Sequence, residues 1–174
     1  MITKPNFENT PKYYHYYIDL SDQIDLLAAL VHSKEQILGF KKMTSEGIKD
    51  YAYAPGKWTV AQLIRHCIDT EIIMFYRVLW AIREDLTNMP SFDEDRFANN
   101  SNISTTASLD SLFEEWLLVR NSNILLVQNT RSEAFDNDGL VNGNKIPSKA
   151  LAWMVNGHGI HHLNVLNERY LNKG

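Results

Sequence analysis

The sequence predicts an all-α protein folded as a four-helix bundle. Four segments of about 20 residues each carry apolar side chains at helical spacing. The 174 residues include only 8 glycines and 5 prolines, which disfavours the many tight turns of a β-sandwich. A chain of this length can bury one substantial core, so we expect residues 1–174 to form a single domain.

The first two predicted helices lie in the N-terminal half of the chain. The first spans residues 20–40, and its apolar stripe consists of Ile24, Leu27, Val31 and Leu38. We expect the tyrosines before it to pack rather than to recognise a ligand: Tyr13, Tyr14, Tyr16 and Tyr17. The second helix begins at Thr59, where Thr59 and Gln62 fit a capping box, and continues to about Leu86. Its latter half is apolar on more than one side, which predicts deep packing.

The other two predicted helices lie in the C-terminal half. One begins near Ser108 and runs to about Gln128, with an apolar stripe of Leu109, Leu112, Trp116 and Val119. The last follows Pro147, takes Ser148 as its N-cap and reaches about Tyr170. The connections over 87–107 and 129–147 are rich in turn-forming residues. Bundles of this kind commonly hold metal ions in their cores.

Composition excludes several classes of partner and of site. The net charge is −4 and the basic residues are scattered, so a nucleic-acid partner is not expected. No apolar run approaches the roughly 20 residues that span a bilayer, and residues 1–11 are too polar for a signal peptide. The single cysteine, Cys67, rules out an internal disulfide and a cysteine-rich zinc site. We therefore expect a cytoplasmic protein.

Histidines on the last predicted helix are the first candidate metal ligands. His158 and His162 are four residues apart, so their Cβ atoms lie roughly 5–6 Å from each other on one helix face. His161 offers an alternative pairing with His158 at a spacing of three, which spacing alone leaves open. Gly157 and Gly159 flank His158 and each cost about 1 kcal/mol of helix stability against alanine. They indicate that another group approaches the backbone closely there.

Three residues of the second predicted helix complete the candidate site. His66 supplies a third imidazole, and three neutral imidazoles are an established zinc ligand set that leaves a fourth position for water or substrate. The alternative for a lone histidine is a hydrogen-bonded core residue. Asp69 could orient an imidazole, or be a solvated or salt-bridged carboxylate. Arg77 could bind an anionic substrate, or form an ion pair with Glu71 or Glu84. No Glu-x-x-His, His-Glu-x-x-His or Gly-x-Ser-x-Gly motif occurs.

Four motifs resemble the DinB-like superfamily, in particular its YfiT-type branch of metal-dependent hydrolases and bacillithiol S-transferases. In chain order they are Tyr53–Val60 (YAPGKWTV), His66–Glu71 (HCIDTE), Tyr76-Arg77 and Gly157–Tyr170 (GHGIHHLNVLNERY). The resemblance implies an up-up-down-down bundle in which three histidines bind zinc or nickel, and it implies a homodimer. By the matching positions these ligands are His66, His158 and His162, with His161 left out. Ile72 stands where relatives usually carry arginine.

The function expected from the resemblance is that of a metal-dependent enzyme acting on a small molecule. The leading expectation is the transfer of a low-molecular-weight thiol, because a metal-bound thiol is deprotonated and needs no protein nucleophile. Metal-assisted hydrolysis is the second possibility, and it requires a general base. The third is a non-catalytic, stress-associated protein that binds a metal or a ligand. Because one fold can support several functions, only the geometry and chemistry of the site can distinguish these three possibilities.

Overall fold

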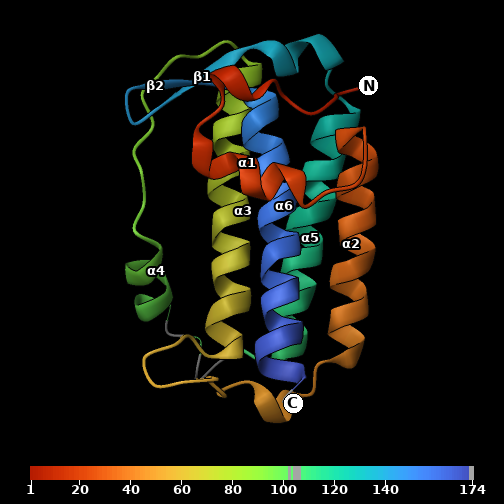
Figure 1. Ribbon diagram of the computed structural model, residues 1–174, viewed down its shortest axis with the longest axis vertical. Helices are drawn as coiled ribbons and strands as arrows, with labels where there is room; N and C mark the ends of the chain where they lie inside the picture. The colour runs from red at the N-terminus through yellow and green to blue at the C-terminus, as the bar shows by residue number, and fades with distance from the viewer. Residues whose placement is uncertain (102, 104–106, 173–174) are drawn as a thin grey trace.

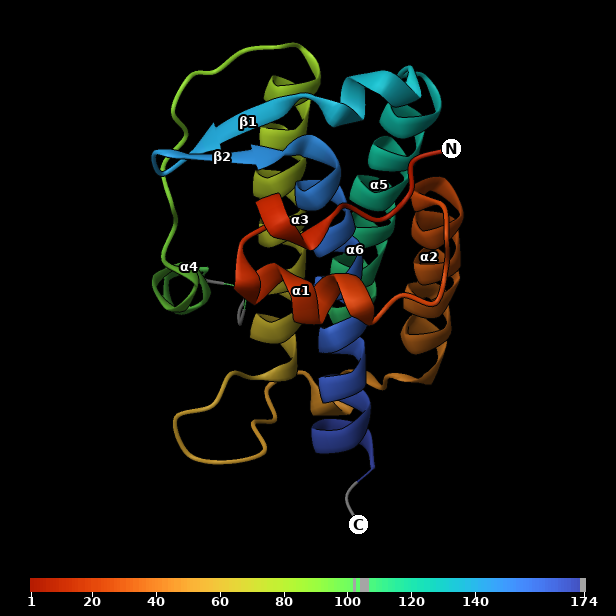
Figure 2. The ribbon, with the colours of Figure 1, turned by 45° about the horizontal axis from the view of Figure 1, so that its top comes forward.

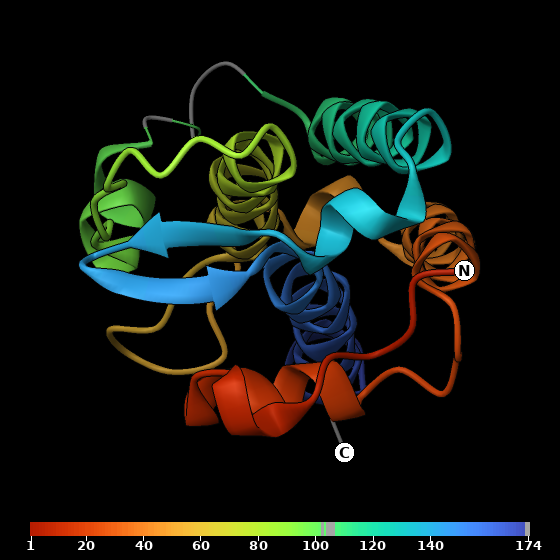
Figure 3. The same cartoon turned by 90° about the horizontal axis from the view of Figure 1, so that it is seen from above.

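Four long helices run side by side along the computed structural model (Figure 1), which describes residues 1–101, 103 and 107–172. These helices are α2 (Leu26–Met43), α3 (Val60–Ile82), α5 (Leu109–Gln128) and α6 (Ser148–Val165). Going round the bundle, α3 and α5 are neighbours that run in one direction, and α2 and α6 are neighbours that run in the other (Figures 1 and 3). The predicted all-α, four-helix bundle is therefore confirmed.

Two of the predicted helix starts are correct to the residue because their caps are local. Thr59 Oγ1 accepts a hydrogen bond from the Gln62 amide at 3.2 Å, and the Thr59 amide donates to Gln62 Oε1 at 2.9 Å. This is the predicted capping box at the start of α3. Ser108 Oγ accepts from the Ser111 amide at 3.1 Å and caps α5. Each cap satisfies backbone N–H groups that the first helical turn leaves without partners.

The first predicted helix is wrong at its start. Asp25 caps α2 through the Ala28 amide, so Ile24 lies before the helix and is 74% exposed. Val31 also faces solvent, and the core face of α2 consists of Leu26, Ala29, Leu30, Ser33 and Ile37. The tyrosine-rich segment forms a separate helix, α1 (Lys12–Asp19), which crosses the front of the bundle (Figure 2).

The last predicted helix, α6, and the second, α3, need smaller corrections. Ser148 is the first residue of α6 rather than its cap, and its hydroxyl instead donates to the Ala134 carbonyl at 3.4 Å. The end of α6 continues as a π-helical segment, Leu166–Leu171. In α3 the predicted deep packing holds for Met74, Phe75 and Val78 but not for Ile72 and Leu79, which are exposed.

The two long connections contain elements that the periodicity did not reveal. The first contains α4 (Glu94–Asn100), and the second contains an antiparallel hairpin of β1 (Asp138–Val141) and β2 (Asn144–Pro147). Asn142 and Gly143, with φ of 48° and 78°, form the two-residue turn between the strands. Asn-Gly is the preferred pair for such a turn, so a sequence signal for the hairpin was available. Short 3₁₀ helices complete the chain: Phe7–Asn9, Glu46–Ile48 and Ser132–Asp136.

A buried polar layer divides the apolar core into two clusters. Each long helix contributes to this layer, which consists of Ser33, Glu71, Trp116, Arg120, Asn123 and Asn156. Arg120 Nε and Nη2 donate to the two Glu71 carboxylate oxygens at 2.6 and 2.8 Å. Trp116 Nε1 and Asn123 Nδ2 donate to the same carboxylate at 2.8 and 3.1 Å. Both charges are thus neutralised within the layer, which fixes the four helices relative to one another.

None of the helices in the described ranges combines the length and the apolar character that a membrane span requires.

Candidate metal centre

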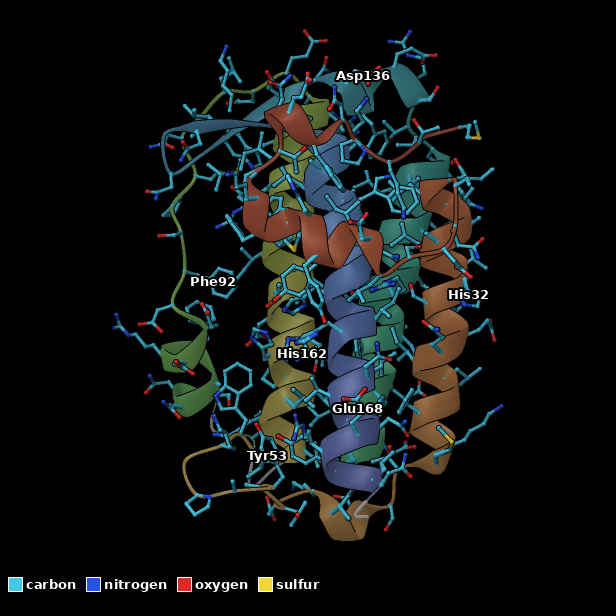
Figure 4. All side chains as sticks on the ribbon, viewed as in Figure 1. His32, Tyr53, Phe92, Asp136, His162 and Glu168 are labelled. Carbon is cyan, nitrogen blue, oxygen red and sulfur yellow. The ribbon has the colours of Figure 1, made fainter. Side chains whose placement is uncertain are left out.

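Three imidazoles converge between α3 and α6. His66 Nε2 lies 3.0 Å from His158 Nε2, and His162 Nε2 lies 3.1 Å from the same atom. Figure 4 shows His162 between the two helices. The ligand atoms of the three residues all lie within 4.8 Å of one another. In the described part of the chain, these histidines form the one cluster of three or more side chains that could bind a metal ion. The structure thus brings together the three histidines selected from the sequence.

The two glycines beside His158 allow the close packing that the sequence indicated. A Cβ atom on Gly157 would lie 1.7 Å from the Tyr17 carbonyl oxygen, so only glycine lets α1 cross α6 at this distance. A Cβ atom on Gly159 would lie 3.2 Å from Arg120 Nη2. The Tyr17 ring then packs against the His158 ring, with 5.6 Å between their centroids. The glycines therefore place α1 over one side of the histidines and the polar layer next to the other.

The three imidazoles cannot satisfy one another by hydrogen bonding. A neutral imidazole nitrogen carries either one proton or one lone pair, so His158 Nε2 cannot form two good hydrogen bonds at once. The other ring nitrogen of His162, Nδ1, is buried without a hydrogen-bond partner among the described residues. A divalent ion at the three Nε2 atoms would resolve the conflict at His158 Nε2, because zinc at about 2.0–2.1 Å from each nitrogen keeps tetrahedral ligands about 3.3 Å apart. The two separations measured from His158 Nε2 need to widen by only a few tenths of an ångström, and all the ligand atoms lie within 4.8 Å of one another, so the three residues can hold an ion.

Burial keeps these imidazoles neutral. It lowers the pKa of His66 from 6.5 to about 4. Burial also lowers the pKa of His158 and of His162, and the neighbouring imidazoles lower both further. Neutral imidazole is the form that binds a metal ion, because its lone pair is free.

The three imidazoles lie in the wall of a cavity of about 780 Å³, which we call the histidine pocket. It lies between α3, α6, α1 and the hairpin, and it includes Tyr14, Tyr17 and Trp58. The Trp58 ring lies 4.7 Å from the His66 ring, and the Tyr170 hydroxyl donates to the Trp58 carbonyl at 2.8 Å. Aromatic walls with a few polar groups are typical of a small-molecule site.

His161 and Asp69 lie outside the three-histidine group. His161 Nδ1 is 3.1 Å from the Tyr16 hydroxyl on α1. Asp69 pairs with Arg65 at 3.4 Å, and Arg65 also pairs with Glu115 on α5. No hydrogen bond to an imidazole is found for Asp69 within the described residues, so the salt-bridged alternative describes it. Asp69 lines a small groove together with residues of α4, whereas His66 lines the histidine pocket.

The structure also places Arg77 and Ile72, the two remaining residues of α3 that the sequence singled out. The suggested ion pair of Arg77 with Glu71 or Glu84 is wrong, because Glu71 pairs with Arg120 and Arg77 lines the histidine pocket. Ile72 is 47% exposed and lines a separate groove on the outer side of α3. An arginine at position 72 would therefore start from the outer face of α3.

Three aromatic residues of the pocket and the whole polar layer were not predicted from the sequence. Tyr14 and Tyr17 are three residues apart on α1 and line the pocket together, a spacing that could have indicated one shared face. Trp58 belongs to the Tyr53–Val60 motif but precedes α3, so helical periodicity does not predict where its side chain lies. The pairing of Glu71 with Arg120 joins residues 49 positions apart, for which one sequence offers no local signal.

Comparison with known proteins agrees with this architecture. A protein of Geobacillus thermodenitrificans, named "Putative metal-dependent hydrolase", is 29% identical over 113 residues, which make up 63% of this chain and 62% of that protein. A protein of Oceanobacillus iheyensis with the same description is 30% identical over 46 residues, 26% of this chain and 27% of its own length. The matches thus span less than two thirds of either relative.

A solved structure shows the same fold over almost the whole chain. YfiT from Bacillus subtilis, described as "a probable metal-dependent hydrolase with an unusual four-helix bundle topology", superposes with a TM-score of 0.67 at 18% identity. The superposition covers 95% of this chain and 90% of YfiT. The profile of the DinB superfamily matches residues 25–166, a range that includes all three histidines. The chain therefore belongs to the DinB superfamily.

Proposed function

We propose that this protein is a metal-dependent enzyme that acts on a small molecule in the histidine pocket. His66, His158 and His162 hold one divalent ion, zinc or nickel. The observation that carries the proposal is the convergence of three neutral imidazoles in a pocket wall, without a fourth His, Cys, Asp or Glu ligand in the described ranges. Structural zinc sites are closed by four protein ligands, whereas catalytic sites keep one position for water or substrate.

Transfer of a low-molecular-weight thiol to an electrophile is the reaction that the pocket supports best. When bound, a divalent ion lowers the pKa of a coordinated thiol, so that the thiolate forms near neutral pH. The protein then needs to position two small molecules rather than to supply a nucleophile. Trp58 and Tyr17 flank the imidazoles, with their rings against those of His66 and His158. The only cysteine, Cys67, is buried, and burial raises the pKa of its thiol, so it is no nucleophile.

Hydrolysis is the second candidate, supported by the descriptions of the two sequence relatives and of YfiT. It requires a base to accept a proton from water. The carboxylates that line the pocket are those of Glu8 and Glu94, both exposed, and Asp69 is occupied by Arg65. The lack of a buried carboxylate beside the imidazoles in the described residues ranks hydrolysis below thiol transfer.

A panel of activity measurements tests the proposal. The zinc-loaded and nickel-loaded proteins are assayed with several thiols against several electrophiles, and with esters and amides. We expect turnover that depends on the metal, that is lost in His158→Ala and His162→Ala, and that survives in His161→Ala. Absence of metal-dependent turnover throughout the panel, together with a fourth protein ligand in a metal-bound crystal structure, would establish the non-catalytic binding protein instead.

A further inference from the structure

Among the described residues that line the histidine pocket, Arg77 is the one with a buried charged side chain. The other charged side chains that line the pocket belong to Glu8, Glu94 and Lys145, and all three are exposed. Arg77 has only 6% of its surface exposed. A buried cation is unusual in a pocket wall and requires a compensating group.

The surroundings of Arg77 supply hydrogen-bond acceptors but no negative charge. Nη2 donates to the Pro90 carbonyl at 2.6 Å, and Nη1 donates to the thioether sulfur of Met74 at 3.0 Å. The Phe92 ring centroid lies 5.9 Å from Cζ, and Figure 4 shows Phe92 on the long connection beside α3. No carboxylate in the ranges 1–101, 103 and 107–172 lies within ion-pair distance of Arg77. Since a guanidinium has five N–H donors, most of its hydrogen-bonding capacity is left for a ligand.

Arg77 lies on the same face of α3 as His66. The pocket-lining residues of α3 are His66, Thr70, Met74 and Arg77, at spacings of four, four and three. A rise of 1.5 Å per residue separates the first and last Cα atoms by about 16 Å. The bond to Met74 shows that the Arg77 side chain leans toward the N-terminal end of α3, which is the direction of His66. The guanidinium is thus within reach of a small molecule that also touches the imidazoles.

Tyr14 provides a second donor from the helix that crosses the bundle. It lines the same pocket as Arg77, from α1, and is 2% exposed. Burial raises the pKa of Tyr14, so the hydroxyl keeps its proton at neutral pH. A neutral phenol beside a guanidinium offers donors to an anion without adding a competing charge.

We propose that Arg77 and the Tyr14 hydroxyl bind a carboxylate of the substrate whose reacting atom lies at the three imidazoles. The inference rests on the proposed function and narrows its substrate class to small molecules with a carboxylate several bonds from the thiol or electrophilic centre. The planar fork of arginine matches the two oxygens of a carboxylate. A phosphate carries up to two negative charges, and the exposed carboxylates of Glu8 and Glu94 in the same pocket disfavour it.

Direct binding of succinate to the zinc-loaded, full-length protein tests this inference without turnover. Calorimetry gives the affinity, and the Nε–H signal of Arg77 in ¹⁵N spectra reports contact with the guanidinium. We expect Arg77→Met to weaken binding by about 10- to 100-fold, because a charge-assisted bidentate contact is lost. Arg77→Lys should keep part of the affinity, since it keeps the charge without the fork. Tyr14→Phe should lose a few-fold.

Two controls separate a lost contact from a lost fold. Arg96→Met makes the same chemical change at an exposed arginine that lines only the neighbouring grooves, and its affinity for succinate should equal that of the wild type. Succinamide, the uncharged analogue, should bind at least ten-fold more weakly than succinate. Zinc content and circular dichroism check the fold of each variant. If Arg77→Met does not fold, Arg77→Lys and Tyr14→Phe carry the test.

The outcomes distinguish this inference from the proposed function. Equal succinate affinity in the wild type and the folded Arg77 variants overturns the inference, as does binding of succinamide as tight as that of succinate. Either result is compatible with metal-dependent turnover of an uncharged substrate. Arg77-dependent binding of succinate by a protein that shows no metal-dependent turnover would instead overturn the proposed function alone.

Discussion

The two buried arginines of this protein have opposite surroundings, although both belong to the bundle. Arg120 has none of its surface exposed and meets Glu71 through two hydrogen bonds, while Ser33 and Asn156 accept from its remaining terminus. Arg77 is nearly as buried but has a carbonyl and a thioether as its acceptors. In the polar layer Arg120 and Glu71 neutralise each other, although Asn156 Nδ2 lacks a hydrogen-bond partner among the described residues. The histidine pocket instead holds a cation without a counter-charge and imidazoles that cannot satisfy one another. The paired charge therefore belongs to the structural layer, and the unpaired charge lies at the proposed binding site.

Breaking the polar layer should have the largest effect on stability. Glu71→Gln leaves Arg120 buried without its counter-charge, which we expect to lower the free energy of unfolding by about 3–5 kcal/mol. Urea denaturation followed by circular dichroism measures the change. The matched control is Glu115→Gln, which removes a partly exposed partner of Arg65 and should cost less than about 1 kcal/mol. A Glu71→Gln variant as stable as this control would show that the layer does not hold the helices together.

Removing one histidine should strongly weaken metal binding while the bundle stays folded. His162→Ala should weaken metal binding by about 100-fold or more. Removing a residue that only hydrogen-bonds to a metal ligand typically lowers metal affinity by about 10- to 100-fold, and removing the ligand itself should lower it further. His161→Ala makes the same change one position away and should leave close to one ion per chain, as measured by elemental analysis. Equal loss of metal in both variants would show that His161 is also a ligand.

The pH dependence of stability should also reveal the histidine pocket in the metal-free protein. The pKa of His66 is about 4 in the fold, against 6.5 when it is free, so the unfolded chain binds a proton that the folded chain does not. Stability is therefore highest above pH 6.5 and falls as the pH drops toward 4, by up to about 3 kcal/mol from this residue. Denaturation in chelator at several pH values measures it. His66→Gln should flatten the curve, and an unchanged slope in that variant would contradict the assignment.

The smallest expected effect concerns the contact that holds Trp58 against His66. Tyr170→Phe removes the hydrogen bond to the Trp58 carbonyl and should cost about 1 kcal/mol of stability. Metal affinity should change by no more than a few-fold, since the three ligands keep their own helices. Thermal denaturation and metal titration of the variant check both values. A loss of metal as large as that in His162→Ala would make Tyr170 part of the site.

What could be predicted from the sequence was local. Capping residues such as Thr59 and Ser108 fixed two helix starts, and a four-residue spacing placed His158 and His162 on one face. Choosing His162 over His161 needed the family resemblance, because both spacings are possible on a helix. The ion pair of Glu71 depends on two helices meeting. Helix α1 and the hairpin strands are too short for their periods to be recognised, and the hairpin could have been found only from its Asn142-Gly143 turn. The separate roles of Arg77 and Arg120 likewise emerge only when the helices are assembled.

The contact at Gly157 has a consequence for how this protein can change during evolution. The Tyr17 carbonyl oxygen occupies the place that any Cβ on residue 157 would need, so every side chain larger than hydrogen displaces α1. Because α1 carries Tyr14 and Tyr17 into the histidine pocket, such a displacement would reshape the wall of that pocket. One position in the chain therefore links the placement of α1 to the shape of the pocket. A descendant that gains alanine there would keep the three histidines in its sequence but require a different wall beside them.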